Sequence, residues 1–163
     1  AKDVKEEFGN KIKYILDGGV CAIGIESTII NLTNKPTILR LGGLDISKIR
    51  KTLGCKIDIN INPRKKITSG QSHLHYSPGI PLRMNILKPK NNEAFILIKK
   101  KKNKLNNYFY ISTKNDLNEA AKNLYSCLRK IKNLGYKSVA VEKIPFRGIG
   151  KTINDRLERA SKF

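Results

Sequence analysis

The sequence predicts an α/β protein in two parts, residues 1–61 and residues 82–163, joined by a linker over residues 62–81. Two observations predict this class. Both parts alternate short apolar segments of period two with segments of helical apolar spacing, which is the pattern of strands and helices packed in layers. The stretch NPRKKITSGQSHLHYSPGIP between them carries three prolines, two glycines and no apolar period, as inter-domain connections do.

The first part is predicted to hold two helices and a small group of strands. A helix is expected over residues 3–16, where apolar residues recur at helical spacing after Asp3, a suitable N-cap. A second helix is expected over residues 45–54, with Asp45 as its N-cap and Gly54 as its end. Its inward residues are predicted to be Ile46, Ile49 and Leu53. The predicted strands are residues 21–33, 37–41 and 56–61.

The second part contains the clearest helix of the chain. It opens at Asp116 with Glu119 in a capping-box-like arrangement and ends at Gly135. Its apolar stripe is Leu117, Ala121, Leu124, Leu128 and Ile131. Strands are predicted over residues 93–100, 108–113 and 137–144, and a final helix over residues 148–160. This alternation predicts helices packed on a partly parallel sheet.

The chain is strongly basic, with 33 Lys and Arg against 13 Asp and Glu and a formal net charge of +20. Such a charge favours a polyanionic partner such as RNA. The abundance of Lys, Asn and Ile beside a scarcity of Arg is equally what A/T-rich codons produce at solvated positions. Charge alone leaves both interpretations open.

Cysteine and histidine usage predicts neither disulfides nor a metal site. Cys21, Cys55 and Cys127 are odd in number and lack the spacing of zinc ligands. His73 and His75 stand two residues apart without a neighbouring carboxylate or cysteine. Because the sequence also shows no apolar run of membrane-spanning length and a charged start, we expect a cytoplasmic protein with no membrane association.

Three side chains in the first part are candidates for chemistry. Ser27 and Thr28 are predicted within a strand, where hydroxyls commonly serve the neighbouring backbone. Arg40 is followed by Leu41-Gly42-Gly43 at the end of a predicted strand, where the lack of side chains lets a ligand approach the backbone. The alternative is a structural ion pair between Arg40 and Glu26. The sequence lacks a Ser/His/Asp arrangement, paired carboxylates and a GxxxxGK[ST] loop, which excludes classical hydrolases, glycosidases and P-loop proteins.

The order of motifs resembles a known family. ILDGG, GIESTII, ILRLGG, SGQSHLHYSP, NLYSCLRKI and GIGKTINDRLERA follow one another as in threonylcarbamoyl-AMP synthases, which have a YrdC-like domain and a smaller C-terminal domain. The resemblance covers nearly the whole chain. It implies that residues 1–61 are the C-terminal part of a YrdC-like twisted-sheet catalytic domain. Residues 62–81 would be a linker and lid, and residues 82–163 a small Rossmann-like accessory domain.

The resemblance also implies an activity and roles for four residues. The family joins ATP, L-threonine and bicarbonate into threonylcarbamoyl-AMP and pyrophosphate for tRNA modification; Mg²⁺ accompanies ATP, and no tightly bound cofactor is implied. Ser27 matches the serine that contacts threonine, and Arg40 the arginine that contacts ATP. His75 and Tyr76 match the linker motif that closes over the nucleotide site. No catalytic residue is assigned.

The chain departs from the family pattern in two ways. Ser69 replaces a proline of the linker, and the basic and hydroxyl-bearing front of the catalytic domain is missing from this sequence. Three interpretations therefore stay open: a fragment or a separately encoded half of the synthase, whose front a separate chain could supply; a basic module that binds tRNA or double-stranded RNA; or an inert remnant of a truncated gene. We also expect the linker to be mobile without ligand, because residues 69–72 offer little apolar surface.

We predict that the 163-residue chain alone makes no measurable pyrophosphate from ATP, threonine and bicarbonate. Adenylate formation needs reactants held in line and positive charge placed on the phosphate oxygens, which one arginine and one serine do not supply. A pyrophosphate-release assay on the purified chain measures this directly. Turnover without a second polypeptide would show that the residues that carry the chemistry have been misassigned.

Overall fold

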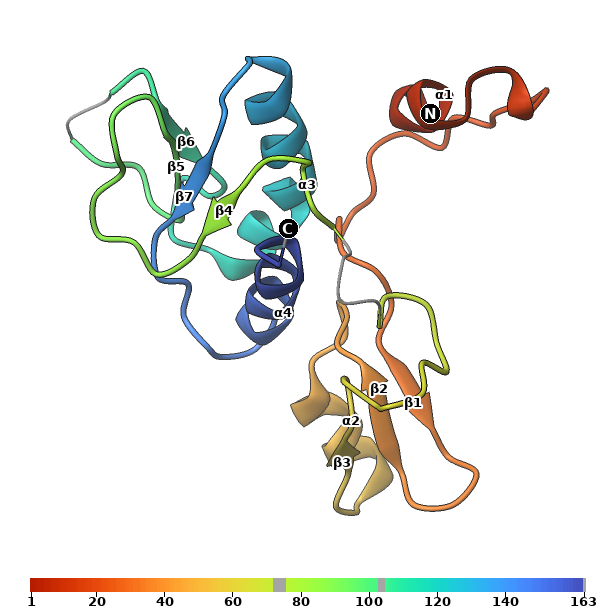
Figure 1. Cartoon of the computed structure of the whole chain (residues 1–163). Coiled ribbons are helices and arrows are strands. Elements are labelled where there is room, and N and C mark those ends of the chain that lie inside the picture. The colour runs from red at the N-terminus through yellow and green to blue at the C-terminus, as the bar shows by residue number, and fades with distance from the viewer. Residues whose placement is uncertain (72–75, 103–104, 163) are drawn as a thin grey trace.

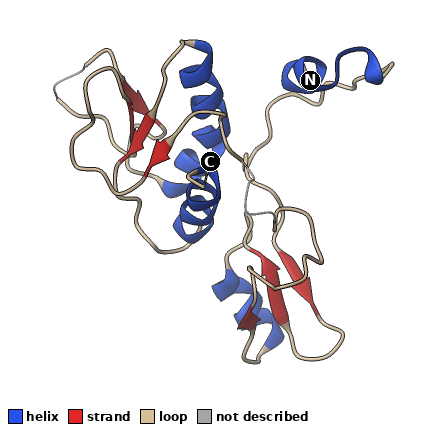
Figure 2. Cartoon of the chain, viewed as in Figure 1, coloured by secondary structure: helices blue, strands red, loops and turns tan. Residues whose placement is uncertain are grey.

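The protein is a mixed α/β structure with two separate sheets (Figure 1). The computed structural model describes residues 1–71, 76–102 and 105–162. The elements of the first part are α1 Lys2–Phe8, η1 Gly9–Lys11, β1 Ile29–Asn31, β2 Thr37–Arg40, α2 Ile46–Leu53 and β3 Asp58–Ile59. Those of the second part are β4 Leu82–Arg83, β5 Ala94–Leu97, β6 Tyr108–Tyr110, α3 Leu117–Asn133, β7 Val139–Val141 and α4 Gly150–Ala160 (Figure 2).

The first sheet has the strand order β1-β2-β3. β1 and β2 are antiparallel, with Ile29 opposite Arg40, so the two segments that carry the predicted site are direct neighbours. β2 and β3 are parallel and are joined through α2, which Asp45 caps and a left-handed Gly54 ends, as predicted. A small core lies between α2 and the sheet and consists of Ile38, Leu41, Ile46 and Ile57.

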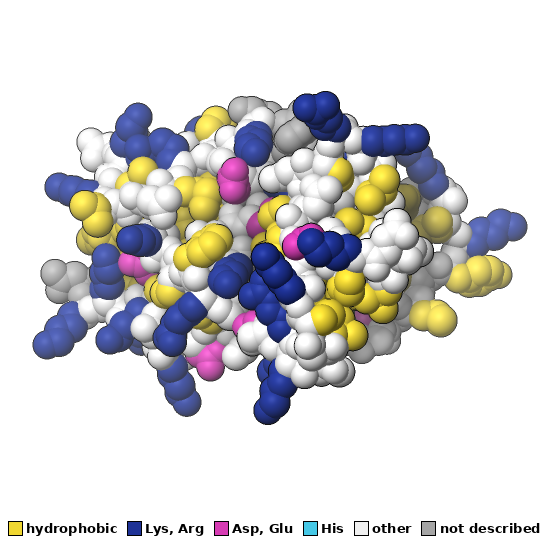
Figure 3. Space-filling model, turned by 90° about the horizontal axis from the view of Figure 1, so that it is seen from below, with side chains coloured by type: hydrophobic (Ala, Val, Ile, Leu, Met, Phe, Trp, Pro, Cys, Tyr) yellow, Lys and Arg dark blue, Asp and Glu magenta, His cyan; other side chains and the backbone are white. Residues whose placement is uncertain are grey.

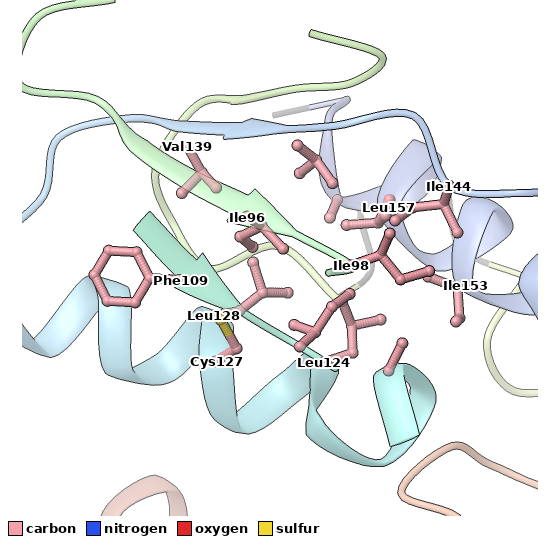
Figure 4. Close-up of a cluster of buried hydrophobic side chains, with 14 of the residues drawn as sticks. Ile96, Ile98, Phe109, Leu124, Cys127, Leu128, Val139, Ile144, Ile153 and Leu157 are labelled. Atoms are coloured by element: carbon pink, nitrogen blue, oxygen red, sulfur yellow. The ribbon is translucent and has the colours of Figure 1, made fainter. Parts of the chain in front are cut away.

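The second sheet has the order β4-β7-β5-β6, and its strands pair in parallel throughout, more completely than the partly parallel sheet predicted. Parallel strands are buried on both faces and therefore consist of unbroken apolar runs. Figure 4 shows Leu124, Cys127 and Leu128 of α3 and Ile153 and Leu157 of α4 pointing into one cluster with the sheet. The opposite face carries a smaller cluster of Phe95, Leu97 and Ala140.

The long helix of the second part is confirmed in its start, stripe and end. The Asp116 carboxylate accepts from the backbone N–H groups of Asn118 and Glu119, and Gly135 follows the helix with a positive φ of 81°. The capping-box expectation is wrong in one respect. Glu119 accepts from Ser112 and Thr113 in the preceding loop, which fixes the exit of β6 instead of the helix backbone.

Several predicted elements are shorter in the structure. The helix expected over residues 3–16 ends at Phe8, because Gly9 takes a left-handed φ of 52° and none of the residues in α1 is buried. A helix without a packed face has little tertiary stabilisation. Leu53, predicted to face inward, is 39% exposed at the end of α2.

The strand predicted over residues 21–33 is reduced to β1, and this changes the setting of Ser27. Gly24 has a φ of 71°, which interrupts the extended backbone. Ser27 and Thr28 therefore lie in an irregular segment that leads into the strand, not within it. β4 was not predicted at all, since its two residues directly follow the proline-rich linker.

We predict that Leu124→Ala lowers the free energy of unfolding by about 2–5 kcal/mol, because Leu124 is fully buried between α3 and the sheet. Leu87→Ala is the matched control, since Leu87 is 94% exposed and its truncation should change stability by less than about 0.5 kcal/mol. Urea titrations followed by circular dichroism measure both. Equal effects of the two substitutions would contradict the described core.

Candidate functional site

The structure brings Ser27 and Arg40 into direct contact. Arg40 Nε donates to the Ser27 carbonyl at 3.0 Å, and its Nη2 donates to the Ser27 hydroxyl at 3.1 Å. Arg40 Nη1 donates to the Ser69 hydroxyl at 2.8 Å. Among the described residues, these hydrogen-bond partners are all uncharged oxygens. The guanidinium is therefore held in place without neutralisation of its charge, which is what an anion-binding arginine requires.

The Leu-Gly-Gly end of β2 fits tightly against the segment that carries Ser27. The Gly43 N–H donates to the Glu26 carbonyl at 2.8 Å, and the Thr28 hydroxyl donates to the Leu44 carbonyl at 2.8 Å. A Cβ at Gly42 would lie 2.2 Å from the backbone of Ser27 and Thr28. No side chain fits there, so this glycine fixes the distance between the two site segments.

Tyr76 brings the linker to the same place. It has a φ of 68°, its ring stacks on Tyr125 with 5.6 Å between centroids, and the Arg156 guanidinium lies 4.7 Å from its ring centre. A Cβ at Gly70 would lie 2.7 Å from the Tyr76 hydroxyl and 3.0 Å from Arg40 Cδ, so that hydroxyl lies near Arg40. Burial, together with the charge of Glu26, raises the pKa of Tyr76 to about 12, which keeps the phenol protonated at neutral pH.

A network of buried charges lies directly behind this group and comes from α4. Arg156 is 1% exposed; its Nε donates to a Glu26 carboxylate oxygen at 3.1 Å, and its Nη2 donates to the Leu41 carbonyl. Arg156 also pairs with Asp155. Burial is the largest influence on the pKa of Glu26 and would raise it, but the positive charge of Arg156 and the hydrogen bonds to the carboxylate together hold that pKa below the ordinary value.

Other polar contacts fasten α4 to the first part of the chain. The buried Thr152 hydroxyl donates to the Gly42 carbonyl at 3.0 Å. Arg159 pairs with Asp155 and donates to the Ile61 carbonyl at 3.0 Å. The second part therefore contacts the backbone of the first part directly, through Thr152 and the NDRLERA motif of α4.

Sequence reasoning identified some of these residues and missed others. The structure brings Ser27, Arg40 and Tyr76 close together, whereas their roles stay predictions and His75 and the neighbouring His73 lie outside the described residues. The alternative ion pair between Arg40 and Glu26 is wrong, because Glu26 pairs with Arg156. The role of Arg156 was missed. Its one signal was its spacing from Thr152 and Ala160, which places a cation on the buried face of α4.

The linker is attached more firmly than its composition predicts. Gln71 is 3% exposed; its amide donates to the Leu39 carbonyl at 2.9 Å and its carbonyl accepts from the backbone of Ile67 and Thr68. Polar contacts thus replace the apolar surface that residues 69–71 lack. Mobility of the linker without ligand stays a prediction.

A cavity lies beside this network. It has a volume of about 660 Å³ and is lined by Glu26, Tyr76, Pro78 and Tyr125 together with residues of α1 and α3. Ser27 and Arg40 contact each other at its side and do not line it. That both side chains face the substrate site implied by the resemblance stays a prediction.

The part of the chain that the structure describes lacks a metal-binding cluster and a membrane-spanning helix. In residues 1–71, 76–102 and 105–162, no three His, Cys, Asp or Glu side chains are grouped so as to hold a metal ion. No helix in these same ranges is both long and apolar enough to cross a bilayer.

The two sheets define a two-part mixed α/β protein. The chain belongs to the threonylcarbamoyl-AMP synthase family, as a family match over most of its length shows. The family description "Threonylcarbamoyl-AMP synthase, C-terminal domain" matches residues 44–162, and the description "Telomere recombination" matches residues 1–42. These matches meet near residue 43, whereas the boundaries predicted at residues 61 and 81 remain predictions.

Individual relatives are threonylcarbamoyl-AMP synthases. The chain is 30% identical to that of Pyrococcus abyssi, covering 100% of this chain and 53% of the relative, and 27% identical to that of Schizosaccharomyces pombe, covering 99% and 48%. Among solved structures it is similar to P. abyssi Sua5 complexed with L-threonine, with a TM-score of 0.83 and 28% identity over 99% of this chain and 53% of that one. The chain spans about half the length of these relatives.

We predict that Glu26→Gln lowers the free energy of unfolding by about 1–3 kcal/mol near pH 7, because Arg156 then stays buried without its carboxylate partner. Since the folded pKa of Glu26 is lowered, its contribution is complete above the unfolded value of 4.5 and is lost as the pH falls through the folded value. Urea titrations from about pH 7 to about pH 3 should show the difference from wild type shrinking. A difference independent of pH would contradict the ion pair.

Proposed function

We propose that this chain forms one wall of an L-threonylcarbamoyladenylate synthase site, in which Ser27 contacts L-threonine and Arg40 contacts ATP. The observation that carries the proposal is the contact between the two side chains. Arg40 donates to the Ser27 hydroxyl and has only neutral hydrogen-bond partners among the described residues. The family relationship and a relative complexed with L-threonine support the same assignment.

The contact also suits the chemistry of these two substrates. Because the Ser27 hydroxyl accepts from Arg40, its own hydrogen is available to an anionic oxygen, such as a threonine carboxylate oxygen. The Arg40 guanidinium, fixed by Ser27 and Ser69, adds a positive charge for a phosphate of ATP, which enters with Mg²⁺ as substrate. Tyr76 and the rest of the linker motif would exclude water, which destroys a mixed anhydride.

The proposed reaction needs more than these residues offer. Carbamate and α-phosphate must be aligned, and several positive charges must meet the triphosphate. We propose that the half of the relatives' length that this chain does not span supplies those groups and the bicarbonate site, within one polypeptide or from a second one. The tRNA product would arise in a later transfer step.

RNA binding by the basic surface is less well supported as a separate function. Figure 3 shows Lys and Arg side chains scattered over the whole of one face, without a single concentrated patch. Of the 33 basic residues, Arg156 and Arg159 are buried in ion pairs and unavailable to a nucleic acid. Binding of tRNA or double-stranded RNA stays a prediction.

We predict that Arg40→Ala weakens ATP binding by about 1.5–3 kcal/mol in a complete synthase, since a charged hydrogen bond is lost. Lys35→Ala is the control, because Lys35 is exposed and pairs with Asp58 at the other end of β2. Ser27→Ala should weaken L-threonine binding by about 0.5–1.5 kcal/mol. Isothermal titration with ATP and threonine measures both. Unchanged ATP affinity in Arg40→Ala would make that arginine a structural clamp on Ser27 and Ser69.

A further inference from the structure

Arg156 is 1% exposed and therefore cannot act as a surface cation. It belongs to α4 in the second part of the chain, yet its guanidinium bonds to Glu26 and Leu41 of the first part. Glu26 immediately precedes Ser27, and Leu41 immediately follows Arg40. One buried side chain thus contacts the neighbours in sequence of both proposed substrate-binding residues.

Glu26 is adjacent in sequence to Ser27, the hydrogen-bond partner of Arg40. Arg40 donates twice to Ser27, so the backbone that carries Glu26 is held beside the Arg40 side chain. The Tyr76 hydroxyl lies near Arg40 and also hydrogen-bonds to the Glu26 carboxylate, which places that carboxylate in the neighbourhood of Arg40. In the structure, Arg156 forms the ion pair with Glu26, and the Tyr125 hydroxyl donates to the same carboxylate at 3.3 Å.

The consequence for Arg40 is electrostatic. A guanidinium paired with a carboxylate has its charge largely neutralised and its donors occupied, and it then competes poorly for an anionic ligand. Arg40 instead bonds to neutral oxygens of Ser27 and Ser69. Tyr76, which stacks on Tyr125 and has the Arg156 guanidinium over its ring, interacts with both Glu26 and Arg40.

We propose that Arg156 is a positioning residue that holds the Glu26 carboxylate away from Arg40 and so leaves the Arg40 guanidinium available to an anionic ligand. The identity of that ligand as ATP rests on the proposed function, whereas the arrangement of the three charges does not. On this proposal the second part of the chain acts directly on the electrostatics of the site, through one side chain of α4.

The test compares three substitutions for binding of ATP by isothermal titration. Arg156→Met keeps most of the apolar volume but frees Glu26, and it is expected to weaken ATP binding about tenfold or more. The double variant Glu26→Gln/Arg156→Met removes the competing carboxylate and is expected to bind within about threefold of wild type. Glu26→Gln alone, although less stable, should also stay within about threefold.

Thr152→Val is the matched control, because it removes another buried contact between α4 and the first part without touching Glu26. It is expected to leave ATP affinity unchanged. An equal loss in Thr152→Val, or a double variant that binds no better than Arg156→Met, would show that α4 acts only as a packing element and would overturn the proposal.

A second measurement needs no ATP and separates this proposal from the proposed function. Carbon-13 NMR of the labelled Glu26 carboxyl group, followed with pH, measures its pKa, and the Glu26→Gln variant assigns the signal. In Arg156→Met, the pKa of Glu26 should stay below its ordinary value and should rise when Arg40→Met is added. If adding Arg40→Met to Arg156→Met leaves the pKa of Glu26 unchanged, the proposal is wrong. If the pKa rises but wild type binds no ATP, only the identity of the ligand is wrong.

Discussion

A guanidinium with 1% exposure must find fixed acceptors for its N–H groups, and this requirement organises the middle of the molecule. Arg156 meets it with oxygens from Glu26, Leu41 and Asp155, and therefore from both parts of the chain. The acceptors are backbone and carboxylate oxygens whose positions are set by the first sheet and by α4. The docking of α4 and the geometry of the site segments consequently depend on the same hydrogen bonds.

Much of the fold could be predicted because its signals are local. Asp45, Gly54 and Asp116 cap or end their helices as the sequence indicates, since each acts on backbone groups only a few residues away. Strand order was out of reach, because the pairing of Leu82 with Val139 depends on tertiary packing over many residues. The helix expected over residues 3–16 carries a good apolar period but buries none of it in α1.

The site residues show the same difference between local signals, which a sequence displays, and tertiary contacts, which it does not. Ser27 and Arg40 stand in motifs that a sequence displays, next to glycines that mark a close backbone approach. Glu26 and Arg156 also stand in such motifs, but nothing near them in the sequence indicates that they pair with each other. An arginine in an amphipathic helix is ordinarily solvated, and only the three-dimensional contact between α4 and the end of β2 shows that this one is enclosed.

The distance along the chain between the partners of this ion pair has a consequence for biosynthesis. Glu26 and Arg156 are separated by 130 residues, so the contact closes a very long loop. A ribosome releases the segment with Ser27 and Arg40 long before it makes α4, and domains fold as units in the order of their synthesis. Until α4 has emerged and docked, the Glu26 carboxylate and the Leu41 carbonyl are therefore without Arg156 as their donor.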